Sequence, residues 1–419
     1  MGTAQTDDAA LSIADRLRAV GPALILAAVV VGPGSIALST IAGGLYGYTL
    51  LWVPVAATIF MITYVWMSAR IGLVTGDTIF EATREKYGST VAKIGGIFGF
   101  LTILAFQGGN NAGIGFASAA LFGFLEPEIW AVVFTGLAIA FLWLPELYDK
   151  VELLVKIVVV VMLLGFVGTL ALVGVDWGGA ARGLVPSFPG TDAILTALGL
   201  AATNFSIAAA VYQTHLMKEK EWGPERLREE GADTLLGIGV LGLIVMVILL
   251  TSAAVIFGTD TPVFSAQGMA EQLRPLAGPA AFYLFTIGFF FASLSSLVVN
   301  ALIGATLLVD GFGGDARMDS RQVKYWSMAA MLIGLIAIIL TSGAGSPIEL
   351  LRAAQALAVV AFPLLAFLVL AIARDTDMMG QFTNPTWVDV LAVIGYITII
   401  GIIVNYLNSV LAYFGYGLF

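Results

Sequence analysis

The feature that most restricts the fold of this chain is a series of apolar runs long enough to cross a lipid bilayer. A membrane-spanning helix needs about 20 apolar residues to cross a hydrocarbon core of roughly 30 Å. Eleven runs come close to this length, at residues 22–43, 49–70, 91–124, 129–145, 151–174, 192–218, 234–258, 278–309, 325–342, 348–373 and 387–415. The third, sixth and eighth runs exceed one crossing, so tilt, breaks or extensions are expected there.

The composition also indicates an integral membrane protein. Hydrophobic residues make up 59% of the chain and charged residues only 11%, whereas a water-soluble domain usually carries about a quarter charged residues. No basic face interleaved with aromatic residues is present, which argues against nucleic-acid binding. The chain has no cysteine, so disulfides, thiolate metal sites and catalytic thiols are excluded. The polar, acidic N-terminal segment does not resemble a signal peptide.

The distribution of lysine and arginine predicts the orientation of the spans. Cytoplasmic loops of membrane proteins carry an excess of these residues. If the N-terminus is cytoplasmic, eleven spans place all but three of the 19 basic residues on the cytoplasmic side. The three exceptions are Arg182, Arg274 and Arg352. The sequence therefore predicts a multi-pass protein of a bacterial-type cytoplasmic membrane, with its C-terminus on the outer side.

Two of the spans contain residues that break helices. Gly32-Pro33-Gly34-Ser35 interrupts the first span, and Thr203-Asn204-Phe205-Ser206 interrupts the sixth. A backbone group freed inside a bilayer costs several kcal/mol unless protein, water or a ligand satisfies it. Breaks five spans apart are the pattern of transporters built from two inverted five-helix repeats, whose substrate lies at the paired breaks.

The chain resembles the Nramp family of proton-coupled divalent-metal transporters, which have the LeuT-like fold. The resemblance rests on the order and spacing of several segments along nearly the whole chain. These segments are Gly21-Pro22 with the first break, residues 70–76 followed by Glu81 and residues 84–88, residues 291–296 leading to Asp310-Gly311-Phe312, and Met379-Gly380 with Asn384-Pro385. The resemblance implies an all-α membrane protein with a 5+5 inverted repeat, broken first and sixth helices, and an added eleventh helix.

The same comparison implies a division of the chain and a loss of metal ligands. The division is a cytoplasmic segment at 1–20, a transporter core at 21–375 with halves at about 21–175 and 190–375, and a linker with the eleventh helix at 376–419. The family has an Asp and an Asn at the first break, where this chain has Gly32 and Ser35. The family's Met-Pro-His motif is replaced here by residues 206–210, and its acidic third helix by the neutral residues 107–111.

The predicted substrate site therefore has no directly coordinating charged group. Its candidate residues come from the two breaks and the third span: Gly32, Gly34, Ser35, Gln107, Asn110, Asn111, Asn204, Ser206, Ile207, Ala208 and Ala209. Without a carboxylate, a bare divalent ion is poorly held, because serines and carbonyls do not compensate for lost water. The expected cargo is a largely hydrated Mg²⁺ or Mn²⁺, moved by alternating access with weak or no proton coupling.

Two other functions fit the sequence. A neutral, roomy site suits an uncharged or zwitterionic small solute, with a carboxylate held by the half-helix that begins near Ser35. A non-transporting membrane sensor is the third hypothesis, by analogy with the Nramp-like domain of a plant ethylene-signalling protein. An enzyme is not expected, because the spans carry no paired carboxylates, nucleophile–base arrangement, metal-ligand cluster or phosphate loop, and no cofactor is predicted.

His215 and a group of polar residues in the eighth span need separate interpretations. His215 is the only histidine and lies in a region where the family has a histidine linked to proton movement. It could titrate on a proton pathway, or it could make an interhelical hydrogen bond. Asn300 and the serines at 293, 295 and 296 are interpreted as interhelical contacts.

Overall fold

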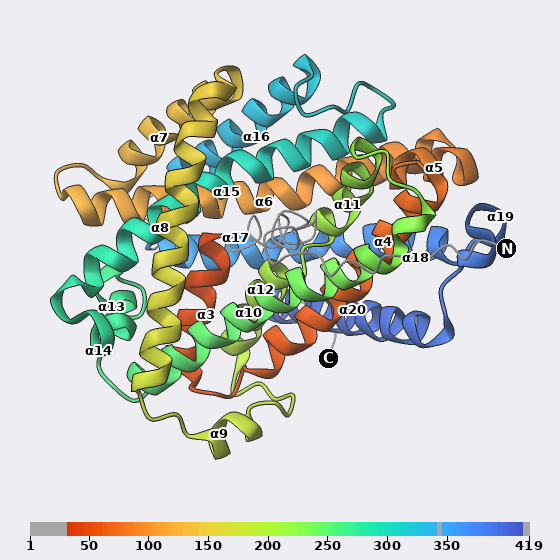
Figure 1. The fold of residues 1–419 in the computed structure, drawn as a ribbon. Helices are drawn as coiled ribbons and strands as arrows, with labels where there is room; N and C mark the ends of the chain where they lie inside the picture. The colour runs from red at the N-terminus through yellow and green to blue at the C-terminus, as the bar shows by residue number, and fades with distance from the viewer. Residues whose placement is uncertain (1–31, 342–345, 414–419) are drawn as a thin grey trace, which may run out of the picture.

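The computed structural model describes residues 32–341 and 346–413, and the side chains of 145–156, 402 and 405–413 lie outside this description. All regular elements in the described residues are helices (Figure 1). The longer ones are α3 (Pro33–Tyr46), α4 (Trp52–Thr75), α6 (Ser89–Phe122), α7 (Pro127–Trp143), α8 (Pro145–Leu172), α10 (Thr191–Asn204), α11 (Ile207–Glu219), α12 (Leu227–Val255), α15 (Ala281–Gly311), α16 (Arg321–Leu340), α17 (Pro347–Ala358), α18 (Phe362–Ala373) and α20 (Thr386–Tyr413).

Short helices and turns connect these long helices. They are α5 (Ile79–Tyr87), α9 (Trp177–Arg182), α13 (Ala266–Ala270), α14 (Arg274–Ala277) and α19 (Thr376–Met379), with 3₁₀ turns at Pro224–Arg226, Glu271–Leu273, Gly278–Ala280, Val359–Ala361 and Gly380–Phe382. The helix α5 begins with a capping box, in which Thr78 and Glu81 each accept a hydrogen bond from the other's backbone N–H.

Ten of the predicted runs coincide with helices or helix pairs of the described residues, and the first run is described only in its second half. The sixth run is the pair α10 and α11, and the tenth is α17 and α18 joined by the turn Val359–Ala361. For the first run, α3 covers the second half, and residues 22–31 lie outside the described residues together with the predicted segment 1–20. By length and composition, seven helical segments of the described chain could each cross a membrane, and three shorter apolar helices accompany them.

The centre of the bundle is formed by helices that are far apart in the sequence. The helix α6 packs along α15 and α17, while α3 packs against α12 and α10, and α11 packs against α4. Figure 1 shows α6 and α15 running side by side, with α7 and α16 on the same edge of the bundle. The broken span α10–α11 therefore lies in the interior, with its neighbours drawn from both halves of the chain.

The packing of α6 on α15 depends on two facing glycines. A methyl group on Gly96 would lie 2.9 Å from the Cα of Gly311 and 2.9 Å from the Leu307 carbonyl oxygen. Neither contact can relax by a side-chain rotation, because both neighbours are backbone atoms. Small residues allow membrane helices to approach closely and gain van der Waals contact, which is the main attraction between helices in lipid.

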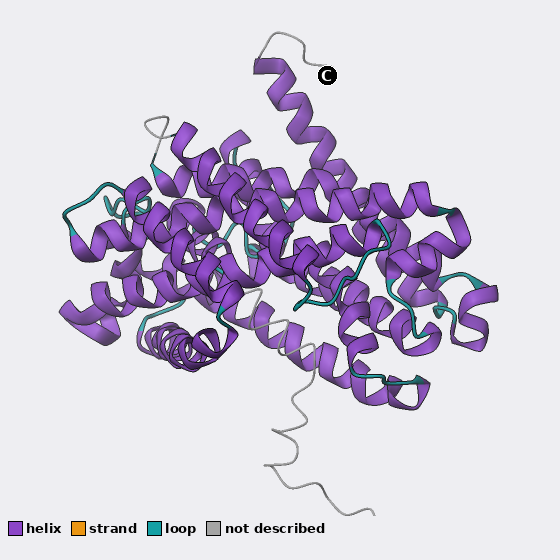
Figure 2. Ribbon diagram, turned by 90° about the horizontal axis from the view of Figure 1, so that it is seen from above, coloured by secondary structure: helices purple, strands orange, loops and turns teal. Residues whose placement is uncertain are grey.

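The segment between α18 and α20 is fastened to α4 and α5. The guanidinium of Arg70 donates to the carbonyl oxygens of Phe382 and Thr383, and Lys86 Nζ lies 2.7 Å from Asp375 Oδ2. The hydrogen bond from Lys86 holds the pKa of Asp375 below its usual range, so this contact persists through the ordinary pH range. Beyond the linker, the C-terminal end of α20 projects from the body of the molecule (Figure 2).

We expect Gly96→Ala to lower the free energy of unfolding by about 1–3 kcal/mol, because the added methyl group forces α6 and α15 apart. The control is Gly136→Ala on α7, where a methyl group meets nothing within 4 Å. That change should be neutral or mildly stabilising, since Ala is the better helix former. Thermal unfolding in detergent measures both, and equal midpoints for the two variants would contradict the packing described here.

Candidate substrate cavity at the two helix breaks

A cavity lies where α3 begins and where α10 gives way to α11. Its empty volume is about 320 Å³, counting the side on which it is open. Its walls come from α3, α6, α10, α11, α15 and α17, and the lining residues are Gly32, Pro33, Gly34, Ser35, Phe106, Asn110, Thr203, Ser206, Asn300 and Gln355. Both helix breaks predicted from the sequence therefore contribute to one cavity.

The first side of the cavity is the N-terminal end of α3. Gly32 is the N-cap in extended conformation, and Pro33 occupies the first helical turn, where its missing N–H costs nothing. No side chain caps this end. The Ser35 hydroxyl lies 3.5 Å from the Thr203 carbonyl oxygen, which joins the start of α3 to the end of α10. The residues before Gly32 lie outside the described residues.

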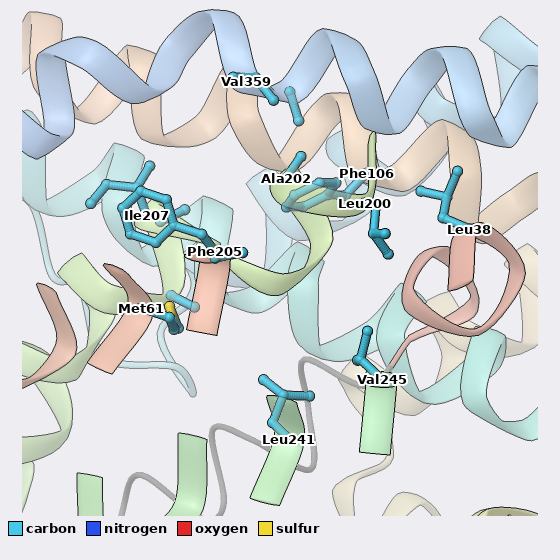
Figure 3. Packing of buried hydrophobic residues seen from close by; sticks show 14 of the residues in the cluster. Leu38, Met61, Phe106, Leu200, Ala202, Phe205, Ile207, Leu241, Val245 and Val359 are labelled. Atoms are coloured by element: carbon cyan, nitrogen blue, oxygen red, sulfur yellow. The ribbon is translucent and has the colours of Figure 1, made fainter. Parts of the chain in front are cut away.

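The second side is the interruption of the sixth span. The helix α10 ends at Asn204, Phe205 and Ser206 are non-helical, and Ser206 caps α11 by accepting a hydrogen bond from the Ala209 N–H at 3.4 Å. The break is held open by packing, because the Phe205 ring lies 5.2 Å from the Tyr64 ring and 5.7 Å from the Phe362 ring. Figure 3 shows Phe205 within a cluster of buried apolar side chains.

Three amide side chains complete the walls: Asn110 on α6, Asn300 on α15 and Gln355 on α17. Gln355 is buried, and its Oε1 has no hydrogen-bond partner. Its place depends on two glycines, since a methyl group on Gly34 would lie 2.8 Å from Gln355 Cδ and one on Gly109 2.6 Å from Gln355 Nε2. A buried acceptor oxygen without a donor costs free energy, and the Oε1 of Gln355 is such an oxygen in a residue that lines the cavity.

The electrostatics of the cavity come from neutral dipoles. None of the ten lining residues is titratable. The N-terminal ends of α3 and α11 bring partial positive charge, while the C-terminal end of α10 brings carbonyl oxygens with partial negative charge. Hydroxyl and amide groups supply both donors and acceptors. Such a cavity can hold a polar or hydrated species by hydrogen bonds, without a fixed charge.

Five of the predicted site residues line the cavity, namely Gly32, Gly34, Ser35, Asn110 and Ser206. The other six do not line it, and most of them support the walls. Gln107 accepts a hydrogen bond from Asn110 at 2.9 Å and donates to the Leu297 carbonyl at 2.9 Å, so it holds Asn110 in place. The buried residues Ile207, Ala208 and Ala209 form the first turn of α11 and pack within the protein.

The remaining two predicted residues make structural hydrogen bonds. Asn111 donates to the carbonyls of Gln107 and Met331 and accepts from the Thr135 hydroxyl at 2.5 Å, which directs its amide toward α7 and α16. Asn204 donates to the Leu200 carbonyl at 2.6 Å and so terminates α10 with its own side chain.

Sequence reasoning missed several lining residues. Gln355 was not singled out, although it is an uncharged polar residue inside the apolar run 348–373. Asn300 was interpreted as an interhelical contact, yet it lines the cavity. Phe106 carried no signal, because an apolar residue in an apolar helix is indistinguishable from core. Their position as polar residues in the middle of spans is the signal that could have identified Gln355 and Asn300.

His215 lies outside the cavity, on α11 nine residues after Ser206. Its Nε2 is 3.1 Å from Asp310 Oδ2 on α15, and its ring stacks on Tyr212. Arg84 on α5 donates to the Asp310 carbonyl oxygen at 2.5 Å. These contacts place His215 in an interhelical polar cluster, and they do not connect it to the cavity lining.

Further contacts fasten α11 to α5. Lys218 Nζ is 2.5 Å from Glu81 Oε2, and the Thr214 hydroxyl accepts a hydrogen bond from the Ile79 N–H at 3.1 Å. The half of the broken span that follows the cavity is therefore bound to the short helix α5 through Thr214 and Lys218, two side chains one helical turn apart.

Comparisons with known proteins agree with this arrangement. A family model described as natural resistance-associated macrophage protein-like, or Nramp, matches residues 23–409. The divalent metal cation transporter MntH of Bacillus subtilis is 28% identical over 382 residues, covering 89% of this chain and 88% of the relative. The MntH of Deinococcus radiodurans is 26% identical over 394 residues, covering 90% and 87%.

Solved structures share the fold. The manganese transporter of Eremococcus coleocola, in complex with an aromatic bis-isothiourea compound, gives a TM-score of 0.77 at 18% identity, covering 93% of this chain and 86% of that chain. MhsT in complex with L-phenylalanine gives a TM-score of 0.59 at 16% identity, covering 92% and 98%. At these identities the likeness concerns the fold alone.

These findings define a multi-pass membrane transporter with the LeuT-like fold, rather than an enzyme. The chain belongs to the Nramp family. The resemblance stated from the sequence motifs is thereby confirmed, as are the all-helical class and the broken-helix fold.

The neighbouring asparagines of α6 provide a test of the cavity, since the chain contains no native cysteine. We expect Asn110→Cys to react several-fold faster than Asn111→Cys with a small water-soluble thiol reagent, because only Asn110 lines the cavity. We also expect Asn111→Cys to lose about 1–3 kcal/mol of stability, since it leaves buried partners unsatisfied. Labelling rates and thermal midpoints measure the two effects, and equal labelling of both sites would contradict the described register of α6.

Proposed function

We propose that this protein is a secondary transporter that moves a divalent metal cation, Mg²⁺ or Mn²⁺, in largely hydrated form. The observation that carries this proposal is a cavity at the two helix breaks whose lining is oxygen-rich and without charge. Relatives over most of the chain are named divalent metal cation transporters. Alternating access would then expose the same cavity to the two sides of the membrane in turn.

The argument for a hydrated cargo is one of ligand chemistry. A divalent ion loses water only where carboxylates or many oxygens replace it, and Mg²⁺ is especially reluctant. At the first break Gly32 and Ser35 offer no carboxylate. Hydroxyl and amide groups then contact water rather than metal.

We further propose that transport is coupled weakly or not at all to protons. Coupling within the cavity needs a group that exchanges a proton as cargo binds, and none of the lining residues titrates. The His215–Asp310 pair lies apart from the cavity lining. We also propose that the protein lies in the cell membrane, with its N-terminus on the cytoplasmic side and its C-terminus on the outer side. The division of the chain into two repeats and an eleventh helix is part of the same proposal.

A second candidate cargo is a zwitterionic small solute, favoured by one observation. The cavity presents the N-terminal ends of α3 and α11, which suit a carboxylate, and the unpartnered Oε1 of Gln355, which suits an ammonium or amide donor. Both groups would be used at once by such a solute, whereas a hydrated cation uses mainly the acceptors.

Transport in proteoliposomes separates these possibilities. We expect Mg²⁺ or Mn²⁺ to enter and quench an internal metal-sensitive dye, without acidification of the interior, because the cavity holds no proton-exchanging group. The control is the same liposomes without protein. Strong internal acidification accompanying metal entry would reject uncoupled transport. If neither ion enters, the divalent-cation proposal fails and the zwitterionic solute becomes the leading candidate.

Restoring the family's missing ligands tests the location of the site. We expect Gly32→Asp with Ser35→Asn to tighten Mn²⁺ binding at least tenfold, or about 1.4 kcal/mol, because a carboxylate replaces water directly. Calorimetry on purified protein measures the change. The control is Gly174→Asp, which adds a carboxylate in a loop where a side chain meets nothing within 4 Å. Equal affinities in both variants would place the cargo elsewhere.

A further inference from the structure

A carboxylate that the cavity does not use is buried at the start of α12. Glu230 is only 3% exposed, although it lies in the first turn of its helix. The next residue, Gly231, borders the Trp66 indole of α4, and the Glu230 carboxylate faces Gln213 of α11. Buried glutamates are rare unless they are paired or neutral, so the partners of this group decide its state.

The side-chain oxygens of Glu230 and Gln213 outnumber the hydrogen-bond donors around them. Gln213 Nε2 donates to Glu230 Oε1 at 2.7 Å. The other oxygens of the two side chains, Glu230 Oε2 and Gln213 Oε1, are both buried and both without a partner. Both are acceptors when Glu230 is ionised. The buried Thr234 hydroxyl, one turn along α12, lies beside the Glu230 carboxyl. It has a single hydrogen to give, so it can satisfy Glu230 Oε2 only by leaving Gln213 Oε1 without a donor.

No cation in the described part of the chain neutralises this carboxylate at ion-pair distance. Arg226 in the preceding turn is 3.1 Å from Glu229, and Arg70 of α4 stacks on Trp66 and bonds to two carbonyls. Lys220 at the end of α11 and Asp233 on α12 act on Glu230 only through opposing longer-range fields. Burying an unpaired carboxylate is expensive, and protonation is the usual escape.

We propose that Glu230 is a proton-binding site, whose carboxyl is neutral in this conformation and forms an acid–amide pair with Gln213. One proton on Oε2 supplies the missing donor. Glu230 then donates to Gln213 Oε1 and accepts from Gln213 Nε2, so that neither side chain is left with an unpaired oxygen. The pair joins α11 to α12 through two reciprocal hydrogen bonds instead of one.

The site is placed where its proton can influence the cavity. Gln213 follows Ser206 by seven residues on the single helix α11, a rise of roughly 10 Å. Loss of the proton leaves a buried anion that needs new donors or water, which favours movement of α11 away from α12. This goes beyond the proposed transport function, and it does not require the proton to be carried across the membrane with the cargo.

Infrared spectroscopy of the purified, full-length protein at neutral pH tests the proposal directly and independently of any cargo. We expect the spectrum of the wild-type protein minus that of Glu230→Gln to contain the carbonyl band of a protonated carboxylic acid. The matched control is Glu229→Gln, an exposed neighbour on the same helix, which should remove a carboxylate band instead. A carboxylate band lost in Glu230→Gln would show that Glu230 is ionised and overturn the proposal.

A second variant keeps the test decisive if Glu230→Gln does not fold. Gln213→Leu removes the amide partner and leaves the acid in place. The carboxylic acid band should then shift toward the frequency of an acid without a hydrogen-bonded carbonyl. If the carboxylic acid band does not change in Gln213→Leu, or if the spectrum contains no carboxylic acid band at all, the acid–amide pair is refuted.

Discussion

The cavity of this protein depends on one constraint, which is that a backbone group without a helical partner must find another in a medium that offers little water. Three helix ends lie inside the bundle: α3 begins after Gly32, α10 ends at Asn204 and α11 begins at Ile207. Pro33 removes one donor, Ser206 satisfies another, and the Asn204 amide occupies a carbonyl of α10. Residues from both breaks line the cavity, so the polarity of the site follows from the groups that end the helices there.

The apolar surroundings of the breaks are equally necessary. Phe205 lies between the two helical halves with its ring against Tyr64 and Phe362, which fixes the direction in which α11 leaves the break. The far end of α11 is fixed in turn by α5, α12 and α15 through Lys218, Gln213 and His215. The helix α11 thus links the cavity to the polar contacts made by Lys218, Gln213 and His215.

The fold was largely predictable from the sequence, because long apolar runs, their basic flanks and two interruptions are local signals. The site was predictable only in part. Both breaks were located, but the stretch from Gln107 to Asn111 is buried on all sides of α6, so no polar face distinguishes Asn110 from Asn111. Gln355 enters the cavity from a helix remote in sequence. The burial of Glu230 and Asp310 depends on tertiary packing, which single residues near span ends do not reveal.

The fit of Gln355 between Gly34 and Gly109 has a consequence for how this site can change in evolution. The three residues come from α17, α3 and α6, and a methyl group at either glycine would collide with the amide. Substitution of either glycine alone is therefore penalised. A shorter side chain at 355 would make room at Gly109, whereas a methyl group on Gly34 would still lie 2.7 Å from Thr203 Cγ2. Homologous sequences should accordingly carry a larger residue at position 109 only together with a shorter side chain at position 355.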